Sequence, residues 1–421
     1  MNMNGWDTIF AANVAYANRA LAQNSAAVLQ TLQASFSGSL GTFNLSIQFG
    51  PWQVVPGGSG KLIKVLLPIT SGTFECPNGQ TYPLAGCQPI MQFSLALQST
   101  GNSGAGQQLQ FLMQQAGQLG QPGAPGFVTP MGFAQQPSFT DAVLQTIFLN
   151  TIASGLVQKA NEVSFAFASI QPSAGGASWL TPRNCAFSYY EPVSGQAGYL
   201  IIFSTGGSAT SLPPVADPTL FSGSASFAIS LPLFLQNVTL PSLVSSFPHA
   251  VNGEFVVTST GQLVLTSGSQ LELGAETVGL ITYYPSVKSL LLTPGNGVMS
   301  VAVSGDCDLY GDCSMTFNVT ANNQFSFTQS GGTCSFLADS NASVKHDTSV
   351  PWWYLGGGLL AYGIANTVAA IVAANVADLV GGKVGSNTLA AVPPVSLQFA
   401  GMQQFTPTNA FLNGALVIQG H

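Results

Sequence analysis

Residues 4–23, NGWDTIFAANVAYANRALAQ, decide how the chain begins and which class of protein it belongs to. Apolar side chains recur at helical spacing from Trp6 to Leu32, with glutamines and Arg19 between them. Asn4 is a suitable N-cap, and Asp7 would stand in the first helical turn. The pattern predicts one amphipathic helix of about 28 residues, roughly 42 Å long.

The same stretch argues against an export signal and against a membrane anchor. It holds no Lys or Arg before Arg19 and no unbroken apolar run ahead of a small-residue cleavage site, so we expect no classical signal peptide. Polar residues recur too often for a bilayer span. We therefore expect the segment to remain in the mature protein as a helix.

Composition limits the classes of partner. The 421 residues are 46% hydrophobic but only 5% charged, and 15 acidic against 8 basic residues give a net charge of −7. Ser, Thr, Asn, Gln and Gly must therefore cover most of the surface. Because Lys and Arg form no cluster, nothing is available to neutralise a nucleic-acid backbone, and we expect no nucleic-acid partner.

Helices and strands alternate along the first half of the chain. Short strand-like runs occupy 41–55, 60–69 and 90–98, and alternation returns at 162–171, 185–192 and 198–204. Between these groups the pattern predicts a helix over 106–119, a loop over 120–137 and a second long helix over 138–161, capped by Ser138.

The second half is dominated by strands. TGGSATSLPPVADP, residues 205–218, is the clearest internal boundary, so we predict domains at 1–210 and 218–421, with strand exchange between the halves allowed. A meander is predicted over 253–273 and a hairpin over 314–330. Residues 351–382 are the most apolar segment, and two interpretations of it stay open: a core helix wrapped by protein, or a membrane-inserting segment over the uncharged residues 352–377.

Signals of catalysis are scarce. PGGSGKL, residues 56–62, lacks the first Gly and the final Ser or Thr of a phosphate-binding loop. Acidic residues around Gly311 lack the late Glu and the spacing of an EF-hand, and we interpret them as an acidic turn. We therefore expect no enzyme, no catalytic residues, no cofactor and no metal site.

Six cysteines do not define a disulfide framework in a chain of this length. Cys76 with Cys87, or Cys307 with Cys313, would be near enough in sequence to close a loop. Free buried thiols are the other interpretation.

Apolar side chains on the long predicted helices suggest instead that the protein binds a hydrophobic ligand. A groove between a helix and a curved sheet would hold an acyl chain at about 0.8 kcal/mol per buried CH₂. The candidate positions, which would face either such a groove or the core, are Trp6, Phe10, Val14, Ile147 and Phe148.

Motifs from end to end of the chain resemble a known family. They are NGWDTIFAANVAYANRAL at the start, FGPWQVVPGGSGKLIKVLLPITSG, then ASWLTPRNCAFSYYEPVSGQAGYLIIFSTGG, and FLNGALVIQGH at the end. Together they are similar to the clostridial forty-seven-kilodalton and OrfX-like proteins, which are encoded beside botulinum neurotoxins and related toxins. This chain departs from the Lys-rich clostridial members in its very low charge.

The resemblance implies an α+β, TULIP-like fold, in which two similar modules of long helices are wrapped by highly curved antiparallel sheets. It also implies a non-enzymatic accessory of a bacterial toxin, insecticidal in some relatives, that binds a lipid, another hydrophobic ligand or toxin-cluster partner proteins. The alternative is a membrane-inserting or pore-forming toxin that uses residues 352–377. We expect the protein to stay in the bacterial cytoplasm until release or export by a non-classical route.

Overall fold

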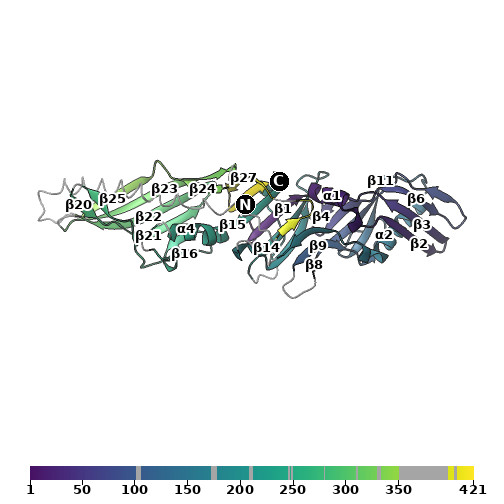
Figure 1. Cartoon of the computed structure of the whole chain (residues 1–421), viewed down its shortest axis with the longest axis horizontal. Coiled ribbons are helices and arrows are strands. Elements are labelled where there is room, and N and C mark those ends of the chain that lie inside the picture. Colours follow the sequence, from purple (N-terminus) through teal and green to yellow (C-terminus); the bar gives the residue numbers. More distant parts are fainter. Residues whose placement is uncertain are drawn as a thin grey trace. The chain divides into compact units, whose positions relative to one another are not determined.

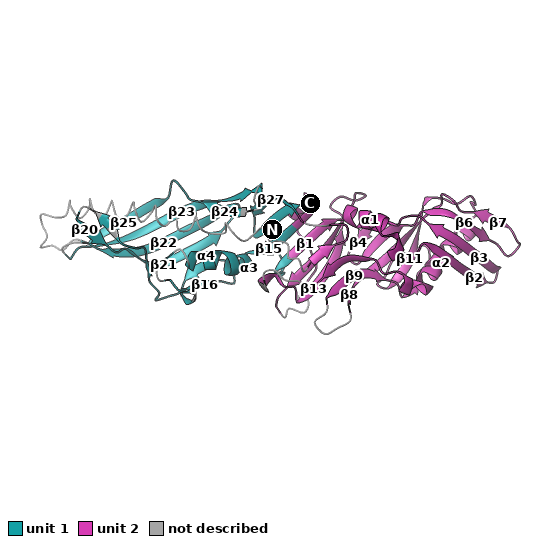
Figure 2. Ribbon diagram, in the orientation of Figure 1, with its two compact units in different colours: residues 1–8, 227–392, 406–420 teal, residues 9–226, 393–405, 421 magenta. Residues whose placement is uncertain are grey.

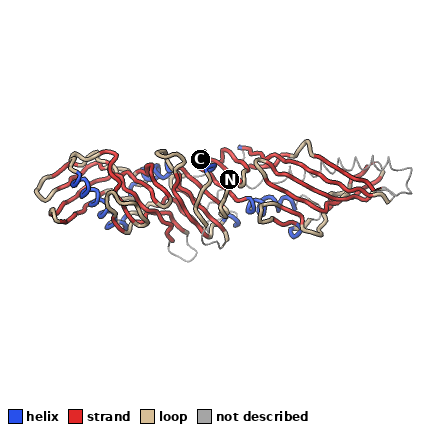
Figure 3. The backbone as a smooth tube through the Cα atoms, turned by 180° about the vertical axis from the view of Figure 1, so that it is seen from behind, coloured by secondary structure: helices blue, strands red, loops and turns tan. Residues whose placement is uncertain are grey.

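The computed structural model describes residues 1–100, 106–171, 178–207, 212–244, 247, 250–278, 280–309, 312–329, 333–349, 397–402 and 405–421. Most of this chain is β-strand, with a few short helices (Figure 3). It divides into two compact units, each made of separate parts of the sequence (Figure 2). Unit 1 contains residues 1–8, 227–392 and 406–420, and unit 2 contains residues 9–226, 393–405 and 421.

Three groups of strands form unit 2 (Figure 1). The first is the four-stranded sheet β2-β3-β6-β7, with bounds Thr31–Gly38, Gly41–Phe49, Ile69–Glu75 and Thr81–Pro83. The second runs in the order β10-β11-β8-β9-β12-β26, with bounds Gln115–Ala116, Phe127–Gln135, Gln88–Ser99, Gln107–Leu112, Ala166–Ile170 and Leu397–Phe399. Strand β5 (Leu62–Leu66) also pairs with β8, and β4 (Gln53–Ser59) pairs with β5. The third group is β13-β14-β1, with bounds Asn184–Tyr190, Tyr199–Thr205 and Thr8–Asn13.

The helices of unit 2 are α1 (Val14–Gln23) and α2 (Ala142–Gln158). Helix α2 packs against β2, and the contact is close because Gly155 has no side chain: a Cβ there would lie 2.9 Å from the Cβ of Ala34. Short 3₁₀ turns complete the unit, at η1 (Ser25–Ala27), η2 (Ala160–Glu162), η3 (Ser178–Leu180) and η4 (Pro218–Phe221).

Aromatic rings fill the core of unit 2. Trp52 is fully buried and stacks on Phe93, with their ring centroids 5.8 Å apart, and Phe111 lies edge-on to it at the same distance. Around α2, the ring of Phe148 meets Phe74 at 5.5 Å and Phe139 at 5.8 Å. Stacked and edge-on contacts of this kind add to the apolar burial that holds the strands and α2 together.

Unit 1 is built on one long antiparallel sheet. Its strands run in the order β16-β17-β21-β22-β23-β24, with bounds Phe255–Val257, Leu263–Leu265, Ser286–Pro294, Val298–Asp308, Ser314–Thr328 and Thr333–Leu337. Strand β18 (Leu271–Glu272) pairs with β21, and β25 (Ser343–Ser349) pairs with β23. Strands β19 (Glu276–Val278) and β20 (Ile281–Tyr283) form a separate hairpin. A further group runs β15-β28-β27, with bounds Ala225–Ser230, Ala415–Gly420 and Pro407–Leu412.

The described helices of unit 1 are short. They are α3 (Leu231–Phe234), the π-helical turn η5 (Leu235–Thr239), α4 (Leu240–Val244) and the 3₁₀ turn η6 (Asn252–Glu254). Along β22 and β23, apolar positions alternate with exposed ones, so one face of this sheet is core and the other is polar surface.

The expected α+β class is confirmed in its antiparallel sheets and in α2. The first helix is shorter than predicted: residues Thr8–Asn13 form strand β1, and Thr31–Gly38 form strand β2. The helix begins only after Asn13, because the side chain of Asn13 accepts a hydrogen bond from the amide of Ala15.

Four other expectations were wrong. Residues 106–119 contain strands β9 and β10 instead of a helix, because β9 pairs with both β8 and β12. The predicted loop 120–137 contains strand β11, and the predicted hairpin 314–330 is the single strand β23 through Thr328. The cap of α2 is Asp141 instead of Ser138, since its carboxylate accepts the amides of Val143 and Leu144 at 2.8 and 2.9 Å.

Residues 351–382, and with them the alternative of membrane insertion through 352–377, lie outside the described residues. Within the described ranges, each helix is too short or too polar to cross a bilayer. The domains at 1–210 and 218–421, and their similarity as modules, stay predictions.

All six cysteines are free thiols. Burial raises the pKa of Cys87, Cys185 and Cys334 to about 12.

Candidate functional site

The strand-to-helix corner at the start of α1 forms one wall of a cavity. Asn13 fixes this corner because its amide donates to the carbonyl of Ser224 at 2.9 Å, while Val14 donates to the carbonyl of Gly198 at 3.0 Å. Helix α1 has a buried face and an exposed face. Val14, Ala17 and Leu21 are buried, whereas Ala15 and Arg19 are exposed.

The exposed side of α1 contributes two polar side chains, Arg19 and Gln23, to the cavity. Ala15, Arg19 and Gln23 follow each other at four-residue spacing and therefore share one face of the helix. The guanidinium carbon of Arg19 lies 5.5 Å from the centre of the Tyr16 ring, within the range of a cation–π interaction. Arg19 thus presents a permanent positive charge beside an aromatic ring.

The rest of the lining comes from segments far from α1 in the sequence. Gly401, Met402, Ser224 and His421 line the cavity together with α1, and the volume of this half-open cavity is about 830 Å³. Gly401 has a φ of +76°, and a Cβ there would collide with the carbonyl oxygen of Tyr16. Only glycine lets the turn approach α1 so closely.

A second cluster brings together two of the sequence motifs that carry the family resemblance. Glu191, at the end of β13, accepts the hydroxyl of Tyr189 at 2.8 Å and the amide of Gly58 at 3.2 Å, and it also accepts the amide of Gly57. Gly60 forms an isolated β-bridge with Tyr189. Beside this cluster lies a cavity of about 430 Å³.

Burial and the neighbouring Glu191 carboxylate raise the pKa of Tyr189 well above its ordinary value. The tyrosine therefore stays protonated as a hydrogen-bond donor. Its role here is to hold the end of β4, which contains Gly57 and Gly58, against β13, so the glycine-rich segment that resembles a phosphate loop is a structural junction.

The five residues predicted to face a groove or the core are all buried: Trp6, Phe10, Val14, Ile147 and Phe148. Phe10 and Val14 share the corner behind the α1 cavity, and the Phe10 ring meets Phe399 at 5.0 Å. Ile147 and Phe148 lie on α2, and Trp6 belongs to unit 1. Their assignment to a ligand groove stays a prediction.

The residues that line the α1 cavity were missed by sequence reasoning, apart from the helix itself. Arg19 carried a usable signal, because it is one of only 8 basic residues in the chain and sits on an amphipathic helix. Nothing in the sequence around Met402 indicates a binding residue, since only the folded chain brings Met402 close to α1.

The acidic segment before Gly311 is part of a strand in the structure. Asp306 accepts the hydroxyl of Ser286 at 2.6 Å and lies 3.5 Å from the ammonium of Lys288. Across the part of the chain that the structure describes, no three His, Cys, Asp or Glu residues are grouped to hold a metal ion.

Comparison with known proteins gives one consistent result. A family model described as "OrfX-like: Protein OrfX2/OrfX3/P47" matches residues 3–400. Protein P47 of Clostridium botulinum (strain Kyoto / Type A2) is 22% identical over 438 residues, covering 100% of both chains.

Two solved structures share the fold. P47 from C. botulinum A2 superimposes with a TM-score of 0.81 at 20% identity, covering 100% of this chain and 98% of the other. P47 of C. botulinum E1 gives a TM-score of 0.79 at 20% identity, covering 99% of both. The chain therefore belongs to the OrfX-like family of bacterial toxin gene clusters.

Proposed function

We propose that this protein is a non-enzymatic accessory component of a bacterial toxin system, and that it binds a lipid or another amphipathic ligand in the α1 cavity. The observation that carries the proposal is the lining of that cavity: a guanidinium, an aromatic ring and a thioether face one space of about 830 Å³. That volume lies within the range of about 300–1,000 Å³ that is usual for ligand sites.

The two kinds of lining group suit the two ends of an amphipathic molecule. Arg19 offers planar N–H donors that match a phosphate or carboxylate, and none of the described lining residues is Asp or Glu. Met402 and the Tyr16 ring offer apolar surface, and methionine adapts its shape to irregular chains. A lipid with its anionic headgroup at Arg19 and its acyl segment over Met402 would contact both the charged and the apolar part of the lining.

The absence of catalysis is part of the same proposal. Acid–base or nucleophilic catalysis by a histidine such as His421 needs a second group that orients or activates it, and the other described residues that line the α1 cavity include no Asp, Glu, Cys or Lys. Burial raises the pKa of the thiols of Cys76, Cys87, Cys185, Cys307 and Cys334, so fewer of them are thiolates and they are poorer nucleophiles. A cytoplasmic location before release, partner proteins from the toxin cluster and an insecticidal role belong to this proposal as well.

The test is transfer of fluorescent phosphatidylglycerol out of phosphatidylcholine vesicles. We expect the wild-type protein to extract the lipid, and Arg19→Gln to bind it about tenfold more weakly, which equals about 1.4 kcal/mol. Arg183→Gln is the matched control, because Arg183 is the other arginine and is also exposed but lies elsewhere in unit 2.

A second pair tests the apolar wall. Met402→Asp should weaken extraction, whereas Met131→Asp, at an exposed methionine on β11, should not. Mass spectrometry of the extracted lipid should show it unaltered. Failure of the wild type to extract lipid, equal affinity of Arg19→Gln and wild type, or a modified lipid product would each refute the proposal.

A further inference from the structure

The sheet β2-β3-β6-β7 of unit 2 has an outer face that is polar but almost uncharged. Its inner positions, such as Phe43, Leu45 and Phe74, are buried, while the alternate positions point outward. On the three longer strands, these outward positions carry Ser, Thr, Asn or Gln, with Glu75 as the exception.

Strand register aligns these side chains into two rows. One row runs Gln33, Ser46, Thr73 across β2, β3 and β6, and the next runs Ser35, Asn44, Glu75. Neighbouring strands lie about 4.8 Å apart, so each row places three hydrogen-bonding groups at a nearly regular spacing. Antiparallel pairing holds both rows on a rigid support.

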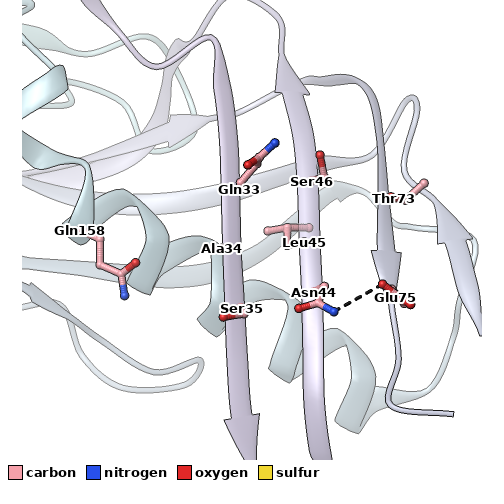
Figure 4. Close-up of a pocket in the computed structure, with 9 residues that line it drawn as sticks. All are labelled: Gln33, Ala34, Ser35, Asn44, Leu45, Ser46, Thr73, Glu75 and Gln158. Carbon is pink, nitrogen blue, oxygen red and sulfur yellow. Dashed lines mark hydrogen bonds between the residues drawn. The ribbon is translucent and has the colours of Figure 1, made fainter. Parts of the chain in front are cut away.

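A cavity of about 460 Å³ lies over these rows and extends to Gln158 at the end of α2 (Figure 4). Within it, the amide of Asn44 donates to the carboxylate of Glu75 at 3.4 Å, as the dashed line in Figure 4 marks. The Glu75 carboxylate can only accept hydrogen bonds, whereas the Asn44 side chain can both donate and accept them.

The chemistry of this lining selects a ligand class. Because the lining has no Lys, Arg or His, an anionic phosphate or sulfate would find no counter-charge. Because only Ala34 and Leu45 are apolar among the lining residues, an acyl chain would gain little surface burial. What remains is a neutral molecule rich in hydroxyl groups.

We propose that this cavity binds a neutral carbohydrate. A pair of adjacent sugar hydroxyls would donate to the Glu75 carboxylate and accept from the Asn44 amide. The side-chain amide of Gln33 and the hydroxyls of Ser46 and Thr73 would serve further hydroxyls along the same rows, and the amide of Gln158 would serve one at the margin of the cavity. The site is separate from the α1 cavity, and its ligand differs in class from the lipid proposed there.

The experiment is an array of neutral oligosaccharides, followed by saturation-transfer NMR on those bound. We expect the wild-type protein to bind at least one neutral glycan, and both Asn44→Ala and Glu75→Ala to weaken binding about tenfold or more. Asn318→Ala is the matched control, because Asn318 is also an exposed strand asparagine, on β23 of unit 1.

Circular dichroism of each variant separates loss of binding from loss of fold. Arg19→Gln should leave glycan binding unchanged, so this proposal can fail or succeed independently of the lipid site. Absence of binding to every neutral glycan, a requirement for sialylated or sulfated glycans, or unchanged binding by correctly folded Asn44→Ala would overturn the assignment. Capture of an unglycosylated protein through the same residues would overturn it too.

Discussion

At the scale of single residues, Tyr189 joins two distant motifs by being held between two glycines. A Cβ on Gly58 would lie 2.8 Å from its ring, and a Cβ on Gly198 would lie 2.5 Å from its hydroxyl oxygen. Its hydroxyl donates to Glu191, and the Glu191 carboxylate also accepts the amides of Gly57 and Gly58 at the end of β4. One side chain therefore sets the distance between the end of β4 and β13.

Gly198→Ala should destabilise the protein by about 1–3 kcal/mol, because the added methyl group overpacks the Tyr189 ring and hydroxyl. Urea unfolding followed by tryptophan fluorescence would measure this loss. Gly207→Ala is the control in the same unit, since a Cβ there has its nearest neighbour at 3.5 Å and should change stability little. Equal stabilities of the two variants would show that the ring has room to move.

Tyr189 also predicts a pH dependence. An unfolded tyrosine has a pKa of about 10, and burial beside Glu191 raises the folded pKa above that. The stabilisation from Tyr189 is therefore complete below about pH 10 and is lost as the pH rises through that value toward the folded pKa. The free energy of unfolding should fall less steeply between about pH 9.5 and 11 in Tyr189→Phe than in the wild type. Parallel curves for the two proteins would contradict this.

At the scale of elements, α2 shows where sequence patterns suffice. Its apolar residues recur at helical spacing, and the helix lies inside the predicted 138–161. The cap was misplaced by three residues because Ser138 and Asp141 are both good capping residues. Only the folded backbone shows that the amides of Val143 and Leu144 reach Asp141.

Asp141→Ala should lower the free energy of unfolding by about 1 kcal/mol, because two amides of the first turn of α2 lose their acceptor. Asp141→Asn should retain most of the stability, since asparagine caps equally well. Thermal unfolding of the two variants and of Ser138→Ala would compare the caps. A larger loss from Ser138→Ala than from Asp141→Ala would restore the sequence-based assignment.

The β9 region shows where sequence patterns fail. Leu109, Leu112 and Met113 fit a helical spacing, yet Leu109, Phe111 and Met113 also fit strand alternation and are the buried ones. Pairing with β8 and β12 decides between the two patterns, and no local signal reveals those partners. The α1 cavity escaped prediction for the same reason, since Arg19 and Met402 meet only through tertiary structure.

At the scale of the whole molecule, both units are assembled from separate parts of the chain. In unit 2, β26 pairs with β12 through Leu397 and Ile170. In unit 1, the amide of Ser230 donates to the carbonyl of Asp7 at 2.9 Å. The boundary motif at 205–218 marks a change of composition, but each unit also uses residues from beyond it.

Separate expression of 1–210 and 218–421 should therefore give fragments that are less stable than the same residues in the full chain. The first fragment lacks β26 and leaves an edge of β12 unpaired, and the second lacks Asp7. Urea unfolding and limited proteolysis would measure the difference. A chain that joins 393–405 to 1–226 through a flexible linker should recover stability, and failure to do so would assign the loss to another cause.

The pairing of β26 with β12 also constrains how the protein is made. On the ribosome, residues 166–170 emerge long before 397–399, so the nascent chain carries an open sheet edge while most of the remaining sequence is translated. Such an edge is a template for aggregation. Completion of this sheet waits until residues 397–399 have been translated, and a chain that stalls before residue 397 would keep this edge of β12 open.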